Sequence, residues 1–343
     1  MKKQIFFILL GLALVFGGFF AAKYIREQHY PLQVPPSAEW EPFIATLDVQ
    51  QEAFFVESDG VKLEVELFIP NGGNEKKPAV VFTPGSGDSA YQNYDYGLVE
   101  TYILEVFLSH DFAVILVNKR GMGKSEGNYV KNSIEGRTED TWAAVQSIQS
   151  HSQIDADNIG LIGHSQGGWV VSLAAAEHPE IAFFISLVGP TMSMRENALD
   201  NEYHYQRCQG TEGEALDEAL AKRDKMIDLS INIGNWTNFG FFGFDARNMS
   251  YDPRNALKTV QSPGLFVYAE NDDQVSPVPN INRLNDIFDG NIPEHFSVVT
   301  IDGASHAFRV VDDPCESWVN PAQNEQSEQL VYVLHAWLSE QGY

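Results

Sequence analysis

Short apolar segments alternate regularly with longer helical segments from residue 53 almost to the end of the 343-residue chain. The first two apolar segments flank Ser58-Asp59-Gly60, a turn sequence, and predict a hairpin. Alternation of continuously apolar strands with helices is typical of a mostly parallel sheet covered by helices on both faces. We expect strands at 53–57, 61–69, 79–83, 113–118, 159–163, 183–188, 265–269 and 296–301. Helices are expected at 96–110, 138–150 (with Thr138 as N-cap), 167–177 and 325–340.

One segment, residues 191–260, interrupts this alternation and contains no clear strand. About 70 residues is too long for a simple connection between a helix and a strand, so the segment is interpreted as an inserted cap. The α/β core would then comprise residues 53–190 and 261–343. Aromatic residues in the cap are candidates for an apolar acyl or aromatic pocket, or alternatively for the cap's own core: Trp236, Phe239, Phe241 and Phe242.

The N-terminus has the charge pattern of a membrane-targeting segment. Residues 5–22 carry no charge, and the basic residues Lys2, Lys3, Lys23 and Arg26 flank them. Phenylalanine lies at the −3 position for cleavage after either Ala21 or Ala22, which favours an uncleaved anchor over a signal peptide. We therefore expect residues 1–26 to anchor the chain, residues 27–52 to act as a linker, and the catalytic domain to lie outside the cytoplasm, periplasmic or extracellular. Cleavage would instead give a secreted protein.

Composition excludes several classes of function. The chain has 22 basic and 47 acidic residues, a net charge of −25, which is the wrong sign for a nucleic-acid-binding protein. A hydrophobic content of 44% excludes a disordered chain. The two cysteines, Cys208 in the cap and Cys315 near the C-terminus, could form a disulfide that holds the cap over the core, or could be free thiols.

The strongest chemical signal is Gly163-His164-Ser165-Gln166-Gly167, a G-x-S-x-G sequence. It follows an apolar strand and opens a helix of small residues, which is the context that a nucleophile elbow requires. Ser165 is therefore the predicted nucleophile. The alternative is a tight strand–helix turn without chemistry.

A serine nucleophile needs a base and an acid that follow it in the chain. His306 comes directly after the last predicted strand and is the best candidate for the base, whereas His164, His295 and His335 are less suitable. Asp272 and Asp273 both follow the preceding strand and could orient the imidazole.

Backbone N–H groups should stabilise the tetrahedral intermediate. One donor is expected from Gln166, the residue after the nucleophile, and the other from Ser86 in the glycine-containing loop after the strand at 79–83. The sequence shows no metal-binding cluster, and a triad requires no cofactor.

The order Ser165, acid, His306 resembles the α/β-hydrolase superfamily over residues 53–342, and in particular its bacterial esterases and serine aminopeptidase-like members. Residues 118–125 resemble the D-x-R-G-x-G-x-S turn of that superfamily, and residues 269–275 resemble its G-x-x-D-x-x-V segment, which assigns the acid to Asp272. Two departures are Asn118 in place of Asp and Thr83-Pro84-Gly85 in place of His-Gly.

These features predict a serine hydrolase that cleaves carboxylic esters of small molecules through an acyl-Ser165 intermediate. One alternative is an aminopeptidase that acts on short peptides, with Glu202, Glu212 or Glu214 of the cap binding the peptide amine. Another is a hydrolase-like binding protein without catalysis. Activity should fall at low pH as His306 becomes protonated. The oligomeric state cannot be predicted from these features.

Overall fold

A computed structural model of the chain describes residues 36–343 except 74, 95–96 and 317–323. The predicted membrane segment at 5–22, the anchor at 1–26 and the first part of the linker lie outside the described residues. Within the described part of the chain, no helix combines the length and apolar character needed to cross a membrane.

An eight-stranded sheet forms the centre of the molecule, in the order β1-β2-β4-β3-β5-β6-β7-β8. The β1–β2 hairpin and the β2–β4 pair are antiparallel, and all other neighbours are parallel, which confirms the predicted mostly parallel sheet. The strands are β1 (Val49–Ser58), β2 (Val61–Pro70), β3 (Lys77–Thr83), β4 (Ala113–Val117), β5 (Ile154–His164), β6 (Phe184–Leu187), β7 (Gly264–Ala269) and β8 (Phe296–Ile301).

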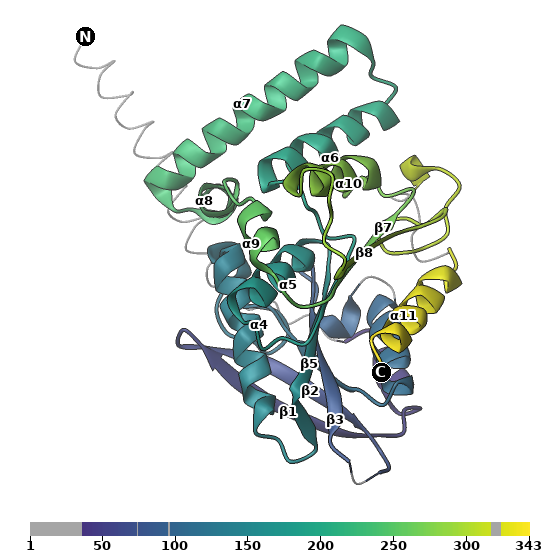
Figure 1. Cartoon of the computed structure of the whole chain (residues 1–343). Helices are drawn as coiled ribbons and strands as arrows, with labels where there is room; N and C mark the ends of the chain where they lie inside the picture. Colours follow the sequence, from purple (N-terminus) through teal and green to yellow (C-terminus); the bar gives the residue numbers. More distant parts are fainter. Residues whose placement is uncertain (1–35, 74, 95–96, 317–323) are drawn as a thin grey trace, which may run out of the picture.

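Helices cover both faces of the sheet (Figure 1). Alternate strand residues face opposite sides, so Val80 and Phe82 contact one layer while Val81 contacts the other. The layer on the Val80 side contains η3 (Val99–Glu105), α3 (Val106–Ser109) and α11 (Glu328–Glu340). The layer on the Val81 side contains α4 (Ile134–Gln149), α5 (Gln166–Glu177), α9 (Arg254–Thr259) and α10 (Pro277–Ile287).

Two sequence expectations about the core are wrong in detail. Residues 40–52, assigned to the linker, form helix α2 (Trp40–Ile44) and the start of β1, because Trp40 is buried against Tyr91 at a ring distance of 5.7 Å.

Thr138 is not the N-cap of α4. The Ser133 hydroxyl caps α4 by accepting from the N–H of Gly136 at 3.0 Å, and Thr138 lies one turn inside the helix.

The cap consists of helices throughout residues 191–260, all of which the structure describes. Its helices are α6 (Met194–Cys208), α7 (Gly213–Thr237), α8 (Gly240–Asn248) and α9. Figure 1 shows α6, α7 and α8 beyond the carboxyl ends of the strands, with the long helix α7 outermost. Leu257 of α9 belongs to the core beneath, so the last helix of the predicted cap packs with the core.

The turn at residues 118–125, which departs from the superfamily pattern at Asn118, obtains its carboxylate from the neighbouring strand. The buried Glu64 of β2 accepts from the Asn118 side chain and from the N–H of Lys124, both at 2.8 Å. Gly123 has φ +52°, and a Cβ there would lie 2.4 Å from the same carboxylate, so only glycine fits. The Asn118 substitution therefore leaves the turn with an acidic partner.

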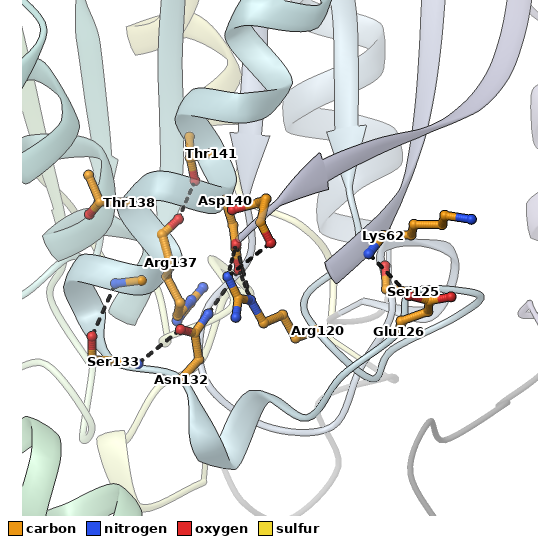
Figure 2. Close-up of polar contacts among 12 residues, drawn as sticks. Lys62, Arg120, Ser125, Glu126, Asn132, Ser133, Arg137, Thr138, Asp140 and Thr141 are labelled. Carbon is orange, nitrogen blue, oxygen red and sulfur yellow. Dashed lines mark hydrogen bonds and ion pairs between the residues drawn. The ribbon is translucent and has the colours of Figure 1, made fainter. Parts of the chain in front are cut away.

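The same turn is tied to α4 by a partly buried ion pair. Figure 2 shows the Asp140 carboxylate between the Arg120 guanidinium and the Asn132 amide. Arg120 Nε and Nη2 donate to the carboxylate at 2.7–3.1 Å, and the Asn132 amide donates at 2.8 Å. Because two guanidinium nitrogens contact one carboxylate, both the orientation of the Arg120 side chain and its distance from Asp140 are fixed. The 118–125 turn is therefore held against α4.

Replacing Glu66 with glutamine should stabilise the protein at neutral pH. Burial raises the pKa of Glu66 above its ordinary value. As the pH rises from the ordinary carboxyl pKa to the raised one, the folded state keeps a proton that the unfolded state has lost, so stability falls. Glutamine resembles the protonated acid, and the free energy of unfolding of Glu66→Gln should exceed that of the wild type at pH 7 and match it at pH 4. Urea unfolding measures this, with the exposed Glu57→Gln on β1 as the control; a gain that does not depend on pH would contradict the assignment.

Candidate active site

Ser165 lies in a strained turn between β5 and α5. Its φ of 53° and ψ of −123° are unfavourable for a residue with a side chain. Its N–H donates to the Leu187 carbonyl at 2.8 Å, and its own carbonyl accepts from Gly168. A Cβ at Gly163 would lie 2.2 Å from the Gly167 carbonyl oxygen, and one at Gly167 would lie 2.2 Å from the Thr83 carbonyl oxygen. The glycines therefore permit the close approach that raises Ser165 above the strand ends.

Asp272 and His306 meet in a buried contact. The His306 Nδ1 and an Asp272 carboxylate oxygen are 2.8 Å apart, and the two residues are 7% and 2% exposed. The other Asp272 oxygen accepts from the N–H groups of Gln274 and Val275 at 2.8 and 2.9 Å. Since the carboxylate accepts a hydrogen bond from the Nδ1–H group, Nε2 is the basic nitrogen of the ring. Of the two candidate acids, Asp272 is the one that contacts His306.

Parallel strands bring all three predicted residues to one edge of the sheet. Ser165 follows β5, Asp272 follows β7 and His306 follows β8, and the carboxyl ends of these strands lie together. His164 joins the elbow to the loop that carries His306, since its Nε2 lies 2.9 Å from the His306 carbonyl oxygen.

His164 is also part of a chain of hydrogen bonds that runs from Gly85 through Tyr94 to His306. A carbonyl oxygen only accepts, so His164 Nε2 carries the proton and its Nδ1 accepts from the Tyr94 hydroxyl at 2.8 Å. The Tyr94 oxygen in turn accepts from the N–H of Gly85 at 2.6 Å. The chain couples the loop after β3 to the loop after β8. Tyr94 was not predicted, because a tyrosine in an irregular segment carries no sequence signal for this role.

Both predicted oxyanion donors border the same pocket as Ser165. Gln166 occupies the first turn of α5, and Ser86 lies in the loop after β3. A Cβ at Gly85 would be 2.9 Å from the Ser165 Cβ, so this loop runs directly against the nucleophile. The structure therefore brings Ser165, Ser86 and Gln166 together.

The buried Arg137 contacts both segments that border Ser165, and it was also not predicted. Its guanidinium donates to the Gln166 side-chain oxygen and to the Pro84 carbonyl. Burial lowers the pKa of Arg137 to about 10, so the side chain still carries its charge at neutral pH. Arg137 therefore links the two segments that carry the candidate oxyanion donors.

The pocket over Ser165 has a volume of about 160 Å³. The first helix of the cap, α6, supplies Met194, Asn197, Ala198 and Asn201 to its wall, and Trp169, Pro190, Gln274 and Val275 come from the core. None of the described residues in its lining is charged. The pocket is thus narrow and neutral.

The cap aromatic residues expected to form an acyl pocket do not line it. Trp236 is 76% exposed and Phe241 is 50% exposed, and both lie in α7 and α8, away from the pocket lining. Phe244, a further aromatic residue of α8, packs against Ala90, Met122 and neighbouring core residues. Trp169 of α5 is the aromatic residue that does line the pocket.

Helix α6 is fastened to the catalytic loops at two points. The Ser276 hydroxyl, four residues after Asp272, lies 2.6 Å from both the Asp200 carboxylate and His204 Nε2. Cys208, the last residue of α6, forms a disulfide with Cys315, which follows the His306 loop. This pairing resolves the alternative between a disulfide and free thiols.

Replacing Cys208 with serine should destabilise the protein by about 4 kcal/mol, because the bond closes a loop with a sequence separation of 107 residues. Urea unfolding with and without reductant measures the loss, and Cys315→Ser should give the same value. A wild type whose unfolding midpoint does not respond to reductant would contradict the disulfide.

The elbow, the Asp272–His306 pair and the neighbouring backbone donors, on this sheet, define a serine hydrolase of the α/β-hydrolase superfamily. The sequence model of the X-Pro dipeptidyl-peptidase (S15) family matches residues 59–231, half of the chain. The chain belongs to this family. No curated protein matches it in sequence.

Solved structures show the same fold at low sequence identity. An esterase of Pyrococcus furiosus is 16% identical with a TM-score of 0.57, covering 91% of this chain and 96% of its own. Est1E of Butyrivibrio proteoclasticus, determined with ferulic acid bound, is 18% identical with a TM-score of 0.56, covering 84% and 99%. The acylaminoacyl peptidase of Pyrococcus horikoshii is 16% identical with a TM-score of 0.57, covering 89% of this chain and 44% of its own.

Proposed function

We propose that this protein hydrolyses carboxylic esters of small molecules through an acyl-Ser165 intermediate. The observation that carries the proposal is the neutral lining of the narrow pocket over Ser165. An uncharged acyl or alkyl group enters such a pocket without leaving a buried charge unpaired.

The proposed reaction uses the groups of the site in turn. Ser165 Oγ attacks the ester carbonyl carbon while His306 Nε2 takes the hydroxyl proton, and the buried Asp272 stabilises the resulting imidazolium. The N–H groups of Ser86 and Gln166 donate to the oxyanion of the tetrahedral intermediate. Collapse breaks the ester C–O bond, and His306 returns the proton to the leaving alcohol. Water, activated by the same base, then releases the acid.

Peptide hydrolysis is the second candidate, favoured by the family name and by the peptidase among the similar structures. A peptidase that recognises the free N-terminal amine of its substrate needs a carboxylate beside the nucleophile. Glu202, Glu212 and Glu214 do not line the pocket, and the nearby Asp200 already accepts from Ser276. The ester reaction is therefore favoured.

Turnover of matched substrates tests this choice. Wild-type protein should cleave short-chain p-nitrophenyl esters with a higher kcat/KM than the dipeptidyl p-nitroanilides that carry a free amine. The opposite order would support the peptidase. Absence of both activities, together with no labelling of Ser165 by a fluorophosphonate, would support the non-catalytic binding protein.

We further propose that residues 1–26 anchor the chain and that the catalytic domain lies outside the cytoplasm. Support comes from the uncharged segment at 5–22 with its flanking basic residues, and from the Cys208–Cys315 disulfide, a bond that persists mainly in oxidising compartments. N-terminal sequencing of the mature protein tests the anchor; a start near residue 23 would overturn it.

A further inference from the structure

A buried lysine holds the loop that carries the candidate oxyanion donor. Lys119, in the turn after β4, is 7% exposed. Its ammonium group donates to three consecutive carbonyl oxygens of the loop after β3, those of Gly85 at 2.8 Å, Ser86 at 3.1 Å and Gly87 at 2.8 Å. One cation therefore directs three successive peptide groups of this loop.

The direction of these carbonyls fixes the direction of the N–H groups. In a trans peptide, the C=O of one residue and the N–H of the next point to opposite sides. The bond from Lys119 to the Gly85 carbonyl thus turns the Ser86 N–H away from the lysine. The N–H of Gly85 donates to Tyr94, so the next one along the loop, that of Ser86, is the oxyanion donor.

The Gly87 side of the loop is open and needs a partner to hold its direction. Gly87 has φ +83° and no atom within 4 Å of its Cβ position, so rotation of the peptide groups there meets little steric resistance. The chain on either side of Lys119 is held in place. The Arg120 side chain is hydrogen-bonded to Asp140 (Figure 2). The Asn118 side chain is hydrogen-bonded to Glu64. Because both neighbours are held, the backbone that carries Lys119 is fixed beside the loop, and its ammonium group makes the three bonds that align the loop.

We propose that Lys119 is a positioning residue of the oxyanion hole, which aims the Ser86 N–H at the developing oxyanion and adds a buried positive charge behind it. The role rests on the proposed acyl-transfer function. A charge in this water-poor environment interacts with the oxyanion more strongly than it would in water.

Lys119→Met tests the role because methionine fills similar space without the charge or the donors. The probe is a trifluoromethyl ketone analogue of the preferred ester. Ser165 Oγ adds to its carbonyl carbon, the π electron pair moves to the oxygen as an oxyanion, and the proton passes to His306. The matching methyl ketone, which binds without this addition, reports ground-state binding alone.

Lys119→Met should weaken binding of the trifluoromethyl ketone by about 30-fold and lower kcat by a similar factor, while methyl ketone binding stays unchanged. Lys77→Met is the matched control: Lys77 is also buried and paired with an acid, Asp111, yet lies at the other end of β3, and its loss should not alter the ratio of the two ketone affinities. Equal weakening of both ketones, or no change for either, would overturn the proposal.

Should Lys119→Met fail to fold by circular dichroism, Lys119→Gln, which keeps an N–H donor, is compared in the same way with the same two decisive outcomes. Ketone affinities are measured directly by fluorine NMR and calorimetry, so they do not depend on ester turnover. Failure of wild-type protein to cleave esters would reject the proposed function, whereas an unchanged ketone ratio would reject the role of Lys119 alone.

Discussion

Replacing Ser165 with alanine should lower kcat for ester hydrolysis by a factor of about 10⁴ or more, because the other serine in the pocket lining, Ser86, lies outside the elbow between β5 and α5. The fold should survive, since the strain of a φ of 53° is the same for alanine as for serine. Initial rates with the best p-nitrophenyl ester, together with circular dichroism, measure both effects.

Ser172→Ala is the matched control for this variant. Ser172 is a buried serine in α5, the helix that follows Ser165, and its hydroxyl donates to the Trp169 carbonyl without reaching the elbow. Its loss should leave kcat nearly unchanged. If Ser165→Ala kept the activity of the control, the acyl-serine mechanism would be refuted.

The features that the sequence predicted well depend on local patterns. The elbow at Ser165 is contained in five consecutive residues between an apolar strand and a small-residue helix, and its geometry follows from glycines at fixed positions. The parallel topology then determines which strand ends lie together, so His306 could be proposed from its place after β8 and an acid from the loop after β7. The choice of Asp272 over Asp273 came from the resemblance to the superfamily segment at residues 269–275.

The features that it missed depend on tertiary contacts. Tyr94 contacts His164 across 70 positions in the chain, and Lys119 reaches Gly85 across 34. Neither residue belongs to a repeating pattern, so only the folded backbone shows the contact. The prediction that cap aromatic residues form the acyl pocket was wrong for a related reason. Aromatic composition does not reveal which helix faces the pocket, and the helix that faces it, α6, is predominantly polar.

Replacing Asp272 with asparagine should lower kcat about 10⁴-fold while the fold and substrate binding persist. An asparagine amide can present its N–H₂ group to His306 Nδ1, which then becomes the acceptor and leaves the proton on Nε2. His306, the proposed base for Ser165, would then carry a proton on Nε2 before the reaction begins. The positive charge that forms on the imidazole would also lose its buried counter-charge. Stopped-flow acylation with a p-nitrophenyl ester isolates this step from deacylation.

Asp273→Asn separates this role from a general loss of acidic charge. Asp273 is adjacent and 3% exposed, so its substitution removes a carboxylate from nearly the same position and depth. It should retain most of the wild-type kcat, because the contact with the imidazole belongs to Asp272. Equal losses in the two variants would mean that the negative potential of the loop, and not the tautomer of His306, limits the rate. Loss in Asp273→Asn alone would reassign the acid of the triad.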